Sequence, residues 1–208
     1  MHLQKRTRKI LGSLSLSDAK FFKDNGYLII PKILSGELLD FIGIYAYNRA
    51  RIEGGTWMED PQAPNTPSFY ADCVMENLLD FLLPKIESAA GMKLLPTYTF
   101  FRVYKSGDIL PKHTDIPGRC EISISLCLRK KGKIWPIYIN NIAVMLEEGD
   151  AVLYKGCEVD HWRAPYTEGT KLAQVFLHYV DANGPYTEWK NDKFPNKYLA
   201  QEKWKWKN

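Results

Sequence analysis

The spacing of hydrophobic residues changes along the chain, and the change divides the chain into two parts. Before about residue 93, apolar residues recur at intervals of three and four, which predicts helices over residues 18–24, 36–52 and 70–90. Pro84 is expected to kink or divide the third helix. After residue 94 the spacing shortens to alternation, so the sequence predicts helices that support a β-rich core.

The alternating segments are short and separated by turn residues. They predict strands over residues 27–30, 94–104, 110–115, 121–128, 135–139, 142–146, 151–154 and 172–180. Many short strands with regular turn signals are typical of an all-β sandwich or barrel. Alternation in residues 121–128 predicts a half-buried strand. In residues 94–104 it gathers Tyr98, Phe100, Arg102 and Tyr104 on one face, which either meets solvent or lines a polar pocket.

One long segment, residues 56–68, contains three prolines and shows no periodicity. It is predicted to be a loop. Long loops in compact domains often act as lids over a site, and a passive excursion is an equally good interpretation.

Composition indicates a single soluble domain. The chain has 208 residues, of which 45% are hydrophobic and 25% charged, and its net charge is +4. Basic residues cluster near both ends and are interpreted as solvated tails, so nucleic acid is not an expected partner: Lys5, Arg6, Arg8 and Lys9, then Lys203, Lys205 and Lys207. No apolar run reaches a membrane span of ~20 residues, and no signal peptide is recognisable. The four cysteines form no C-x-x-C pair, which favours free thiols in the cytoplasm.

The clearest chemical signal is a His-x-Asp sequence, His113-Thr114-Asp115, with a second histidine at position 161. Residues i and i+2 of a strand point the same way, so His113 and Asp115 would share one face. Two histidines and one carboxylate bind Fe(II) and leave coordination positions open. Cys157 would suggest zinc instead, but it lacks a partner cysteine at ligand spacing. His178 is interpreted as a hydrogen-bonded core residue that could face the barrel interior.

These residues and their order resemble the 2-oxoglutarate- and Fe(II)-dependent dioxygenases, most closely the prolyl 4-hydroxylase-like branch. The resemblance covers residues 94–180 and includes His113, Asp115, a Gly149-Asp150 turn and His161. It implies a mainly β fold, a double-stranded β-helix (a jelly-roll, cupin-like core) with buttressing helices. The expected single domain, 1–208, divides into a basic arm at 1–14, helical support at 15–93, the core at 94–182 and a tail at 183–208.

The resemblance also implies the site. His113, Asp115 and His161 match the iron ligands and catalytic centre, and Lys171, ten residues after His161, matches the basic residue that binds the distal carboxylate of 2-oxoglutarate. An exposed position at the junction of loop and strand is the alternative for Lys171. Tyr104 and Arg102 would line the co-substrate pocket. Arg119 and Arg163 are candidates for substrate binding, with a position on the surface rim as the alternative. A tyrosine found in some prolyl hydroxylases is replaced here by Pro111, which departs from that narrower group.

The implied activity is hydroxylation of an unactivated C–H bond with Fe(II), 2-oxoglutarate and O2. A carboxylate at Asp115 also argues against the halogenases of this superfamily, which carry a small residue there. The substrate is open: a prolyl residue of a peptide or protein, or a free amino acid or other small metabolite. Two alternatives of other classes are a cupin-like metal-binding protein without oxidative activity, and a catalytically silent barrel. The sequence indicates neither oligomeric state nor stereochemistry.

Overall fold

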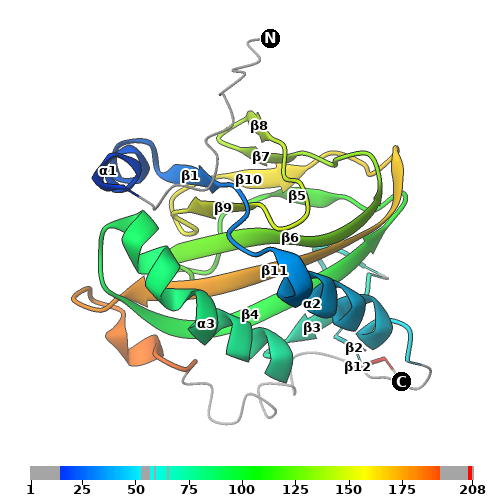
Figure 1. Ribbon diagram of the computed structural model, residues 1–208, viewed down its shortest axis with the longest axis horizontal. Coiled ribbons are helices and arrows are strands. Elements are labelled where there is room, and N and C mark those ends of the chain that lie inside the picture. The colour runs from blue at the N-terminus through cyan, green and yellow to red at the C-terminus, as the bar shows by residue number, and fades with distance from the viewer. Residues whose placement is uncertain (1–14, 53–56, 59, 65, 193–205, 208) are drawn as a thin grey trace.

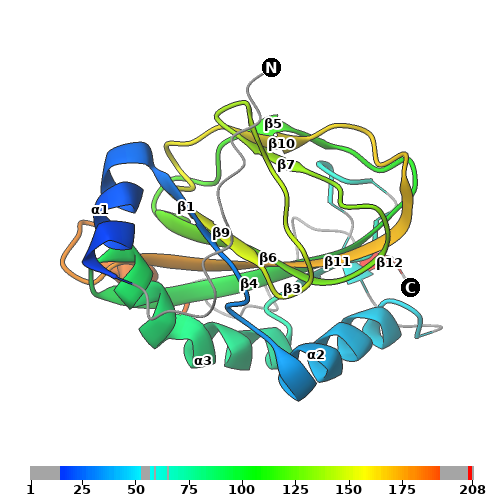
Figure 2. The same cartoon turned by 45° about the horizontal axis from the view of Figure 1, so that its top comes forward.

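The computed structural model describes residues 15–52, 57–58, 60–64, 66–192 and 206–207. Two antiparallel sheets face each other, and helices cover the outer face of the larger one (Figures 1 and 2). The expected basic arm at residues 1–14 and most of the C-terminal tail lie outside the described residues. All four cysteines are free thiols, as predicted.

The larger sheet has eight strands in the order β1-β9-β6-β11-β4-β3-β2-β12, and the smaller has four in the order β5-β10-β7-β8. The strands of the larger sheet are β1 Tyr27–Ile30, β2 Trp57–Met58, β3 Ser68–Tyr70, β4 Leu94–Lys105, β6 Ile122–Gly132, β9 Ala151–Tyr154, β11 Gly169–Asp181 and β12 Trp206–Lys207. Those of the smaller sheet are β5 Leu110–His113, β7 Ile137–Ile139, β8 Ile142–Val144 and β10 His161–Arg163. This is the predicted mainly β, jelly-roll arrangement with helical support.

Three helices pack on or beside the larger sheet: α1 Leu16–Asn25, α2 Gly36–Arg49 and α3 Cys73–Ala90. Their ends follow local chemistry. Ser15 precedes α1 and its backbone N–H donates to Asp18, and Gly26 ends the helix at φ 75°. Asp72 caps α3 by accepting from the N–H groups of Val74 and Met75. Within the described residues, no helix is long and apolar enough to span a membrane.

Several element boundaries differ from the prediction. The segment interpreted as a loop contains β2, and β3 runs from the end of that segment to Tyr70, the predicted first residue of the third helix. Both are short strands: β3 pairs with β4, and β2 pairs with β3. Pro84 does not divide α3, which continues from Cys73 to Ala90. α2 ends at Arg49 rather than at Ile52. A short 3-10 helix, η1 Thr187–Trp189, follows the core.

The larger sheet has a different character on each face. Toward the helices, β4, β6 and β11 present apolar side chains that form the main core, such as Phe101, Ile124 and Val175. Toward the smaller sheet they present a mixture of buried polar and aromatic groups: Tyr98, Arg102, Tyr104, Ser123, Ser125, Gln174 and His178. The prediction that residues 121–128 are half-buried is therefore wrong, because the polar face of that strand lines the barrel interior.

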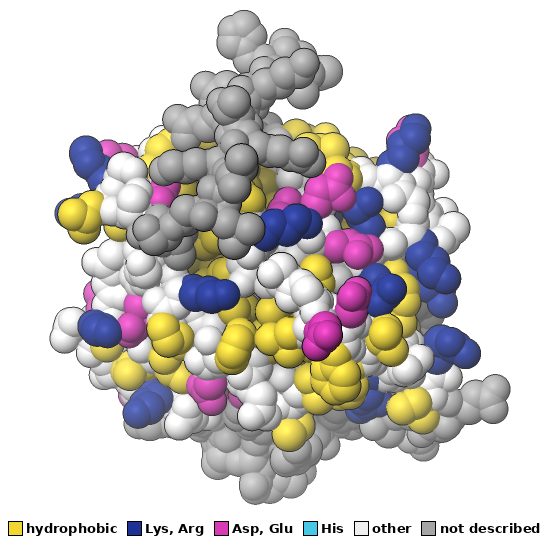
Figure 3. Space-filling view, viewed as in Figure 1, with side chains coloured by type: hydrophobic (Ala, Val, Ile, Leu, Met, Phe, Trp, Pro, Cys, Tyr) yellow, Lys and Arg dark blue, Asp and Glu magenta, His cyan; other side chains and the backbone are white. Residues whose placement is uncertain are grey.

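The outer face of the helical layer is partly apolar (Figure 3). Leu38, Phe41 and Ile44 of α2 and Phe81 of α3 are exposed there. Acidic and basic side chains are interspersed on this face, so it presents no continuous patch of one charge.

Candidate metal centre

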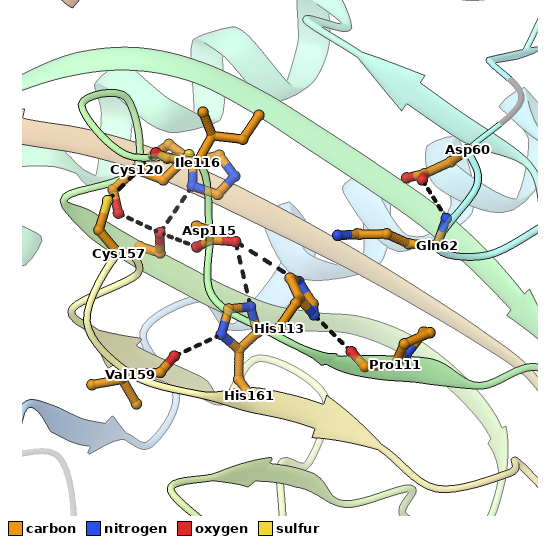
Figure 4. A network of polar contacts seen from close by, with 12 residues as sticks. Asp60, Gln62, Pro111, His113, Asp115, Ile116, Cys120, Cys157, Val159 and His161 are labelled. Atoms are coloured by element: carbon orange, nitrogen blue, oxygen red, sulfur yellow. Dashed lines mark hydrogen bonds and ion pairs between the residues drawn. The ribbon is translucent and has the colours of Figure 1, made fainter.

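The imidazoles of His113 and His161 and the carboxylate of Asp115 converge where β5 ends and β10 begins (Figure 4). Their ligand atoms all lie within 4.8 Å of one another. Oδ1 of Asp115 is 3.4 Å from Nε2 of His161 and 4.0 Å from Nε2 of His113. The three residues predicted as a metal triad are thus brought together.

Pairing of strands β5 and β10 brings the two histidines together. His161 is the direct cross-strand partner of His113, and their ring centroids are 4.2 Å apart. Asp115 is not part of the strand, as the prediction had it. β5 ends at His113, and Asp115 lies in the loop that follows. Its backbone N–H donates to the carbonyl oxygen of Gly156 over 2.8 Å, which fixes its position without strand alternation.

The orientation of each histidine ring is fixed by the backbone carbonyl group two residues before it. Nδ1 of His113 donates to the carbonyl oxygen of Pro111 over 2.7 Å, and Nδ1 of His161 donates to that of Val159 over 3.0 Å. A hydrogen bond at Nδ1 fixes the tautomer and leaves Nε2 as the ligand atom. Both Nε2 atoms point toward Asp115, so the donor set fits a divalent metal.

The protonation states also suit a metal. Burial and the neighbouring His161 lower the pKa of His113. Burial acts to raise the pKa of Asp115, but His161, His178 and Ser123 outweigh it and hold that pKa below its usual range. At neutral pH the site therefore offers one carboxylate and a neutral imidazole at His113, which are the forms that bind metals.

Lys171 does not lie in the barrel interior. It is exposed, and its ammonium lies 6.0 Å from the ring centroid of Tyr47 on α2. Gln174, Phe176 and His178 are the residues of β11 on the inner side. Lys171 lies on the opposite, helix-facing side with Ala173 and Val175, because β11 alternates regularly along β4 from Lys171 to Leu177. The role predicted for Lys171 stays a prediction.

Arg163 lies inside the barrel and is only 2% exposed. Its guanidinium donates to the carbonyl oxygen of Trp135 and, over 2.9 Å, to Oε1 of Gln174. Within the described part of the chain no carboxylate forms an ion pair with it, and its Nε has no hydrogen-bond partner. Burial lowers the pKa of Arg163. The interpretation of this residue as a surface rim residue does not hold.

Two tyrosines accompany Arg163 in the interior. Tyr104 is fully buried and accepts a hydrogen bond from Arg102 over 3.1 Å. Tyr154, which the sequence analysis did not single out, is fully buried next to His161, and among the described residues its hydroxyl has no hydrogen-bond partner. In the sequence, Tyr154 only follows three apolar residues at the end of β9, which gives little sign of a place beside the metal ligands. Its position becomes visible only in the folded structure.

The other two predicted arginines are already engaged. Arg102 is 4% exposed and forms an ion pair with Asp60, so its charge is balanced within the chain. The guanidinium of Arg119 lies 4.4 Å over the ring of Trp189 and 3.9 Å from Asp192. Trp135 is buried and its indole N–H donates to the carbonyl oxygen of Ala164, while Trp162 stacks on Tyr138, so both are packing residues.

Several solved structures have a fold similar to that of this chain. The epimerase SnoN in complex with Fe3+, alpha ketoglutarate and nogalamycin RO superposes with a TM-score of 0.66 at 11% identity, covering 80% of this chain and 83% of SnoN. HygX from Streptomyces hygroscopicus, with nickel, 2-oxoglutarate and hygromycin B bound, gives 0.62 at 12% identity, covering 82% and 88%. A Pseudomonas putida prolyl-4-hydroxylase gives 0.59 at 15% identity, covering 78% and 97%.

The chain has the fold of the 2-oxoglutarate-dependent non-haem oxygenases. No family model matches the sequence, and no curated protein matches it. At these identities the likeness establishes the jelly-roll fold, and the chemistry rests on the residues of the site.

Proposed function

We propose that the protein is an Fe(II)- and 2-oxoglutarate-dependent oxygenase that hydroxylates an unactivated C–H bond. The observation that carries the proposal is the pairing of a His-Asp-His ligand set with a buried, unbalanced arginine on the same strand as His161. Two nitrogen ligands and one carboxylate leave metal positions open for a chelating ligand and O2. Bound together, Fe(II), 2-oxoglutarate and O2 supply the oxidising power, with succinate and CO2 as by-products.

Arg163 is the best candidate to bind the distal carboxylate of 2-oxoglutarate. A buried cation without a counter-charge is costly, and a ligand carboxylate removes that cost. Arg163 is two residues from His161, about 6–7 Å along an extended strand. This separation suits a five-carbon diacid with one end at the metal. Lys171, the candidate from sequence, is the competing proposal.

The hydroxyl of Tyr154 supports the same assignment. It is fully buried without a partner, and Tyr104 and Tyr154 both lie near enough to Arg163 to affect its pKa. A buried hydroxyl that finds no acceptor within the protein favours an acceptor on a ligand. Arg163 and Tyr154 would then hold the carboxylate together, while the aromatic interior excludes water from the reacting centre.

For the substrate we favour a small molecule over a prolyl residue of a protein. Residues 60–64 and Thr66 lie against the barrel, and Ala63 packs into the same apolar cluster as Tyr104 and Trp135. The Asp60–Arg102 ion pair and the hydrogen bond from Arg102 to Gln62 hold this segment against β4. A segment packed in this way leaves less room for an extended chain than for a compact molecule. The molecules bound to SnoN and HygX, nogalamycin RO and hygromycin B, are of that class, whereas the prolyl-4-hydroxylase keeps the other candidate open.

The test is an anaerobic titration. Fe(II) and then 2-oxoglutarate are added to the pure protein, and visible absorption is followed for the charge-transfer band of a chelated 2-oxo acid. The proposal expects a band that saturates at one equivalent and disappears in His113→Ala. Iron binding without any such band in the wild-type protein would favour a cupin-like metal protein without oxidative activity.

A further inference from the structure

The second oxygen of the Asp115 carboxylate is held by a serine on another strand. Oδ2 accepts a hydrogen bond from the hydroxyl of Ser123 over 2.7 Å, while Oδ1 lies nearest to the two imidazoles. Ser123 belongs to β6 and is completely buried. The hydrogen bond from Ser123 occupies one lone pair of Oδ2, so Oδ1 is the oxygen more available to a metal.

A histidine in turn holds the serine. Nδ1 of His178, on β11, lies 3.0 Å from the Ser123 oxygen, and His178 is only 4% exposed. A serine hydroxyl carries one proton. Because the buried carboxylate is the stronger acceptor, that proton belongs to the bond with Asp115, and Ser123 accepts from Nδ1–H of His178. Burial lowers the pKa of His178 to about 4, so the ring is neutral at pH 7.

We propose that Ser123 and His178 are positioning residues that direct Oδ1 of Asp115 at the metal and prevent the carboxylate from binding through both oxygens. This inference rests on the proposed function, since it assumes a metal at His113, Asp115 and His161. Keeping the carboxylate to one oxygen preserves an additional open position, which the chelating co-substrate and O2 both require.

A second metal beside the first is the competing interpretation, because Asp115, Cys120 and His178 also bring three ligand atoms within 4.8 Å of one another. The hydroxyl of Ser123 already bonds to Asp115 and His178 and contacts the carbonyl oxygen of Cys120 at 3.4 Å. Cys120 has its own partner, the Tyr98 hydroxyl at 3.1 Å. This cluster is satisfied by hydrogen bonds, so we expect one metal per chain.

The experiment measures Co(II) binding to the metal-free protein by its visible ligand-field spectrum. Removing partners that orient a metal ligand typically weakens affinity 10- to 100-fold. Ser123→Ala should therefore weaken Co(II) binding by about 10-fold or more and change the spectrum. The matched control is Ser125→Ala, since Ser125 is equally buried two residues along β6 but bonds to Gln174 instead. It should leave the affinity for Co(II) unchanged.

A pair of substitutions at His178 keeps the inference testable if Ser123→Ala does not fold. Asn can reproduce the Nδ1 donor, whereas Leu cannot, so His178→Asn should retain most of the affinity that His178→Leu loses. Equal affinity and spectrum in wild type and Ser123→Ala, or in the Asn and Leu variants, would overturn the positioning role alone. A wild-type protein that binds no Co(II) would overturn the proposed function instead, and two bound ions would establish the second metal site.

Discussion

Nη2 of Arg163 donates to Oε1 of Gln174 over 2.9 Å, and the amide nitrogen of Gln174 donates to the Ser125 hydroxyl over 2.7 Å. The second bond fixes the amide so that its oxygen faces the arginine. Gln174 therefore orients the guanidinium but does not neutralise it. The positive charge inside the barrel remains available to an anionic ligand.

Arg163→Gln should weaken 2-oxoglutarate binding while leaving metal affinity intact. Losing one partner of a buried charge pair costs about 2–5 kcal/mol, so we expect an increase of about 30-fold or more in the 2-oxoglutarate concentration needed for the charge-transfer band. Lys171→Ala is the control, and it should change that concentration by less than about two-fold because an exposed charge contributes little. The reverse result would restore Lys171 as the anchor.

Gly156→Ala should damage the metal centre through a steric clash. A Cβ atom at this position would lie 2.3 Å from the carbonyl oxygen of Cys120, 2.4 Å from Oγ of Ser123 and 2.5 Å from Oδ2 of Asp115. We expect a loss of about 1–3 kcal/mol in the free energy of unfolding, measured by urea denaturation, together with weaker Co(II) binding. Gly107→Ala meets no atom within 4 Å but shares a glycine-like φ, 91°. It should lose some stability and keep full metal affinity.

The metal-free protein should lose stability as the pH falls from about 6.5 to about 4. The pKa of His178 is lowered from 6.5 to about 4 by burial, so over this range the unfolded chain takes up a proton that the folded chain excludes. Protons therefore favour unfolding, by up to roughly 3 kcal/mol. His113 adds a change of the same sign, whereas the lowered pKa of Asp115 matters only at lower pH.

Urea unfolding in the presence of a chelator at pH 7 and pH 4.5 measures this effect. The groups near His178 are Asp115, His161, Tyr98 and Ser123. His178→Asn removes the titrating ring and should reduce the difference in stability between the two pH values. An unchanged difference would show that His178 is not responsible for the acid sensitivity.

Breaking the Arg102–Asp60 pair should destabilise the fold far more than breaking an exposed pair. Both side chains are buried, at 5% and 7% exposure, and Asp60→Asn would leave the arginine without its counter-charge. Removing one partner of such a pair costs about 3–5 kcal/mol. The contrast is Asp24→Ala, which breaks the exposed Lys20–Asp24 pair and should cost less than about 1 kcal/mol by chemical denaturation.

A double substitution of Asp60 and Arg102 measures the interaction between the two side chains apart from the contribution of each one alone. Replacing Asp60 and Arg102 together should cost less than the sum of the single substitutions, since no charge is then left unpaired. Additive losses would indicate that the two side chains contribute separately.

Sequence periodicity predicted the elements that turn residues bound on both sides. β1 and β9 occur over the predicted residues because Gly26 and Pro31 bound the first, while Gly149-Asp150 precedes the second. β3 was missed because three residues are too few to show a period and the strand depends on β4 for its hydrogen bonds. The sequence predicted which residues of β4 and β6 share a face. It did not predict that helices cover one face of the sheet and the smaller sheet covers the other.

The triad itself could be predicted from sequence, while its surroundings could not. His113, Asp115 and His161 are identified by residue type and order, although Asp115 reaches its place through a backbone contact rather than by strand alternation. The face on which Lys171 lies follows from the register of β11 against β4, which the spacing of residues in the sequence does not reveal. The roles of Gly156 and Ser123 depend on contacts among three separate segments, so only the assembled fold shows them.

The hydrogen bonds that fix His113 and His161 also have a consequence for metal competition. They pre-orient the two imidazoles, which together with the Asp115 carboxylate form a donor set that many first-row divalent ions accept. Affinity for such sites generally rises from Fe(II) through Co(II) and Ni(II) to Cu(II). A rigid site of this kind binds the tighter ions readily, so the supply of each ion in the cell would decide which one occupies it. Protein purified over nickel resin should accordingly be stripped and reloaded before its activity is measured.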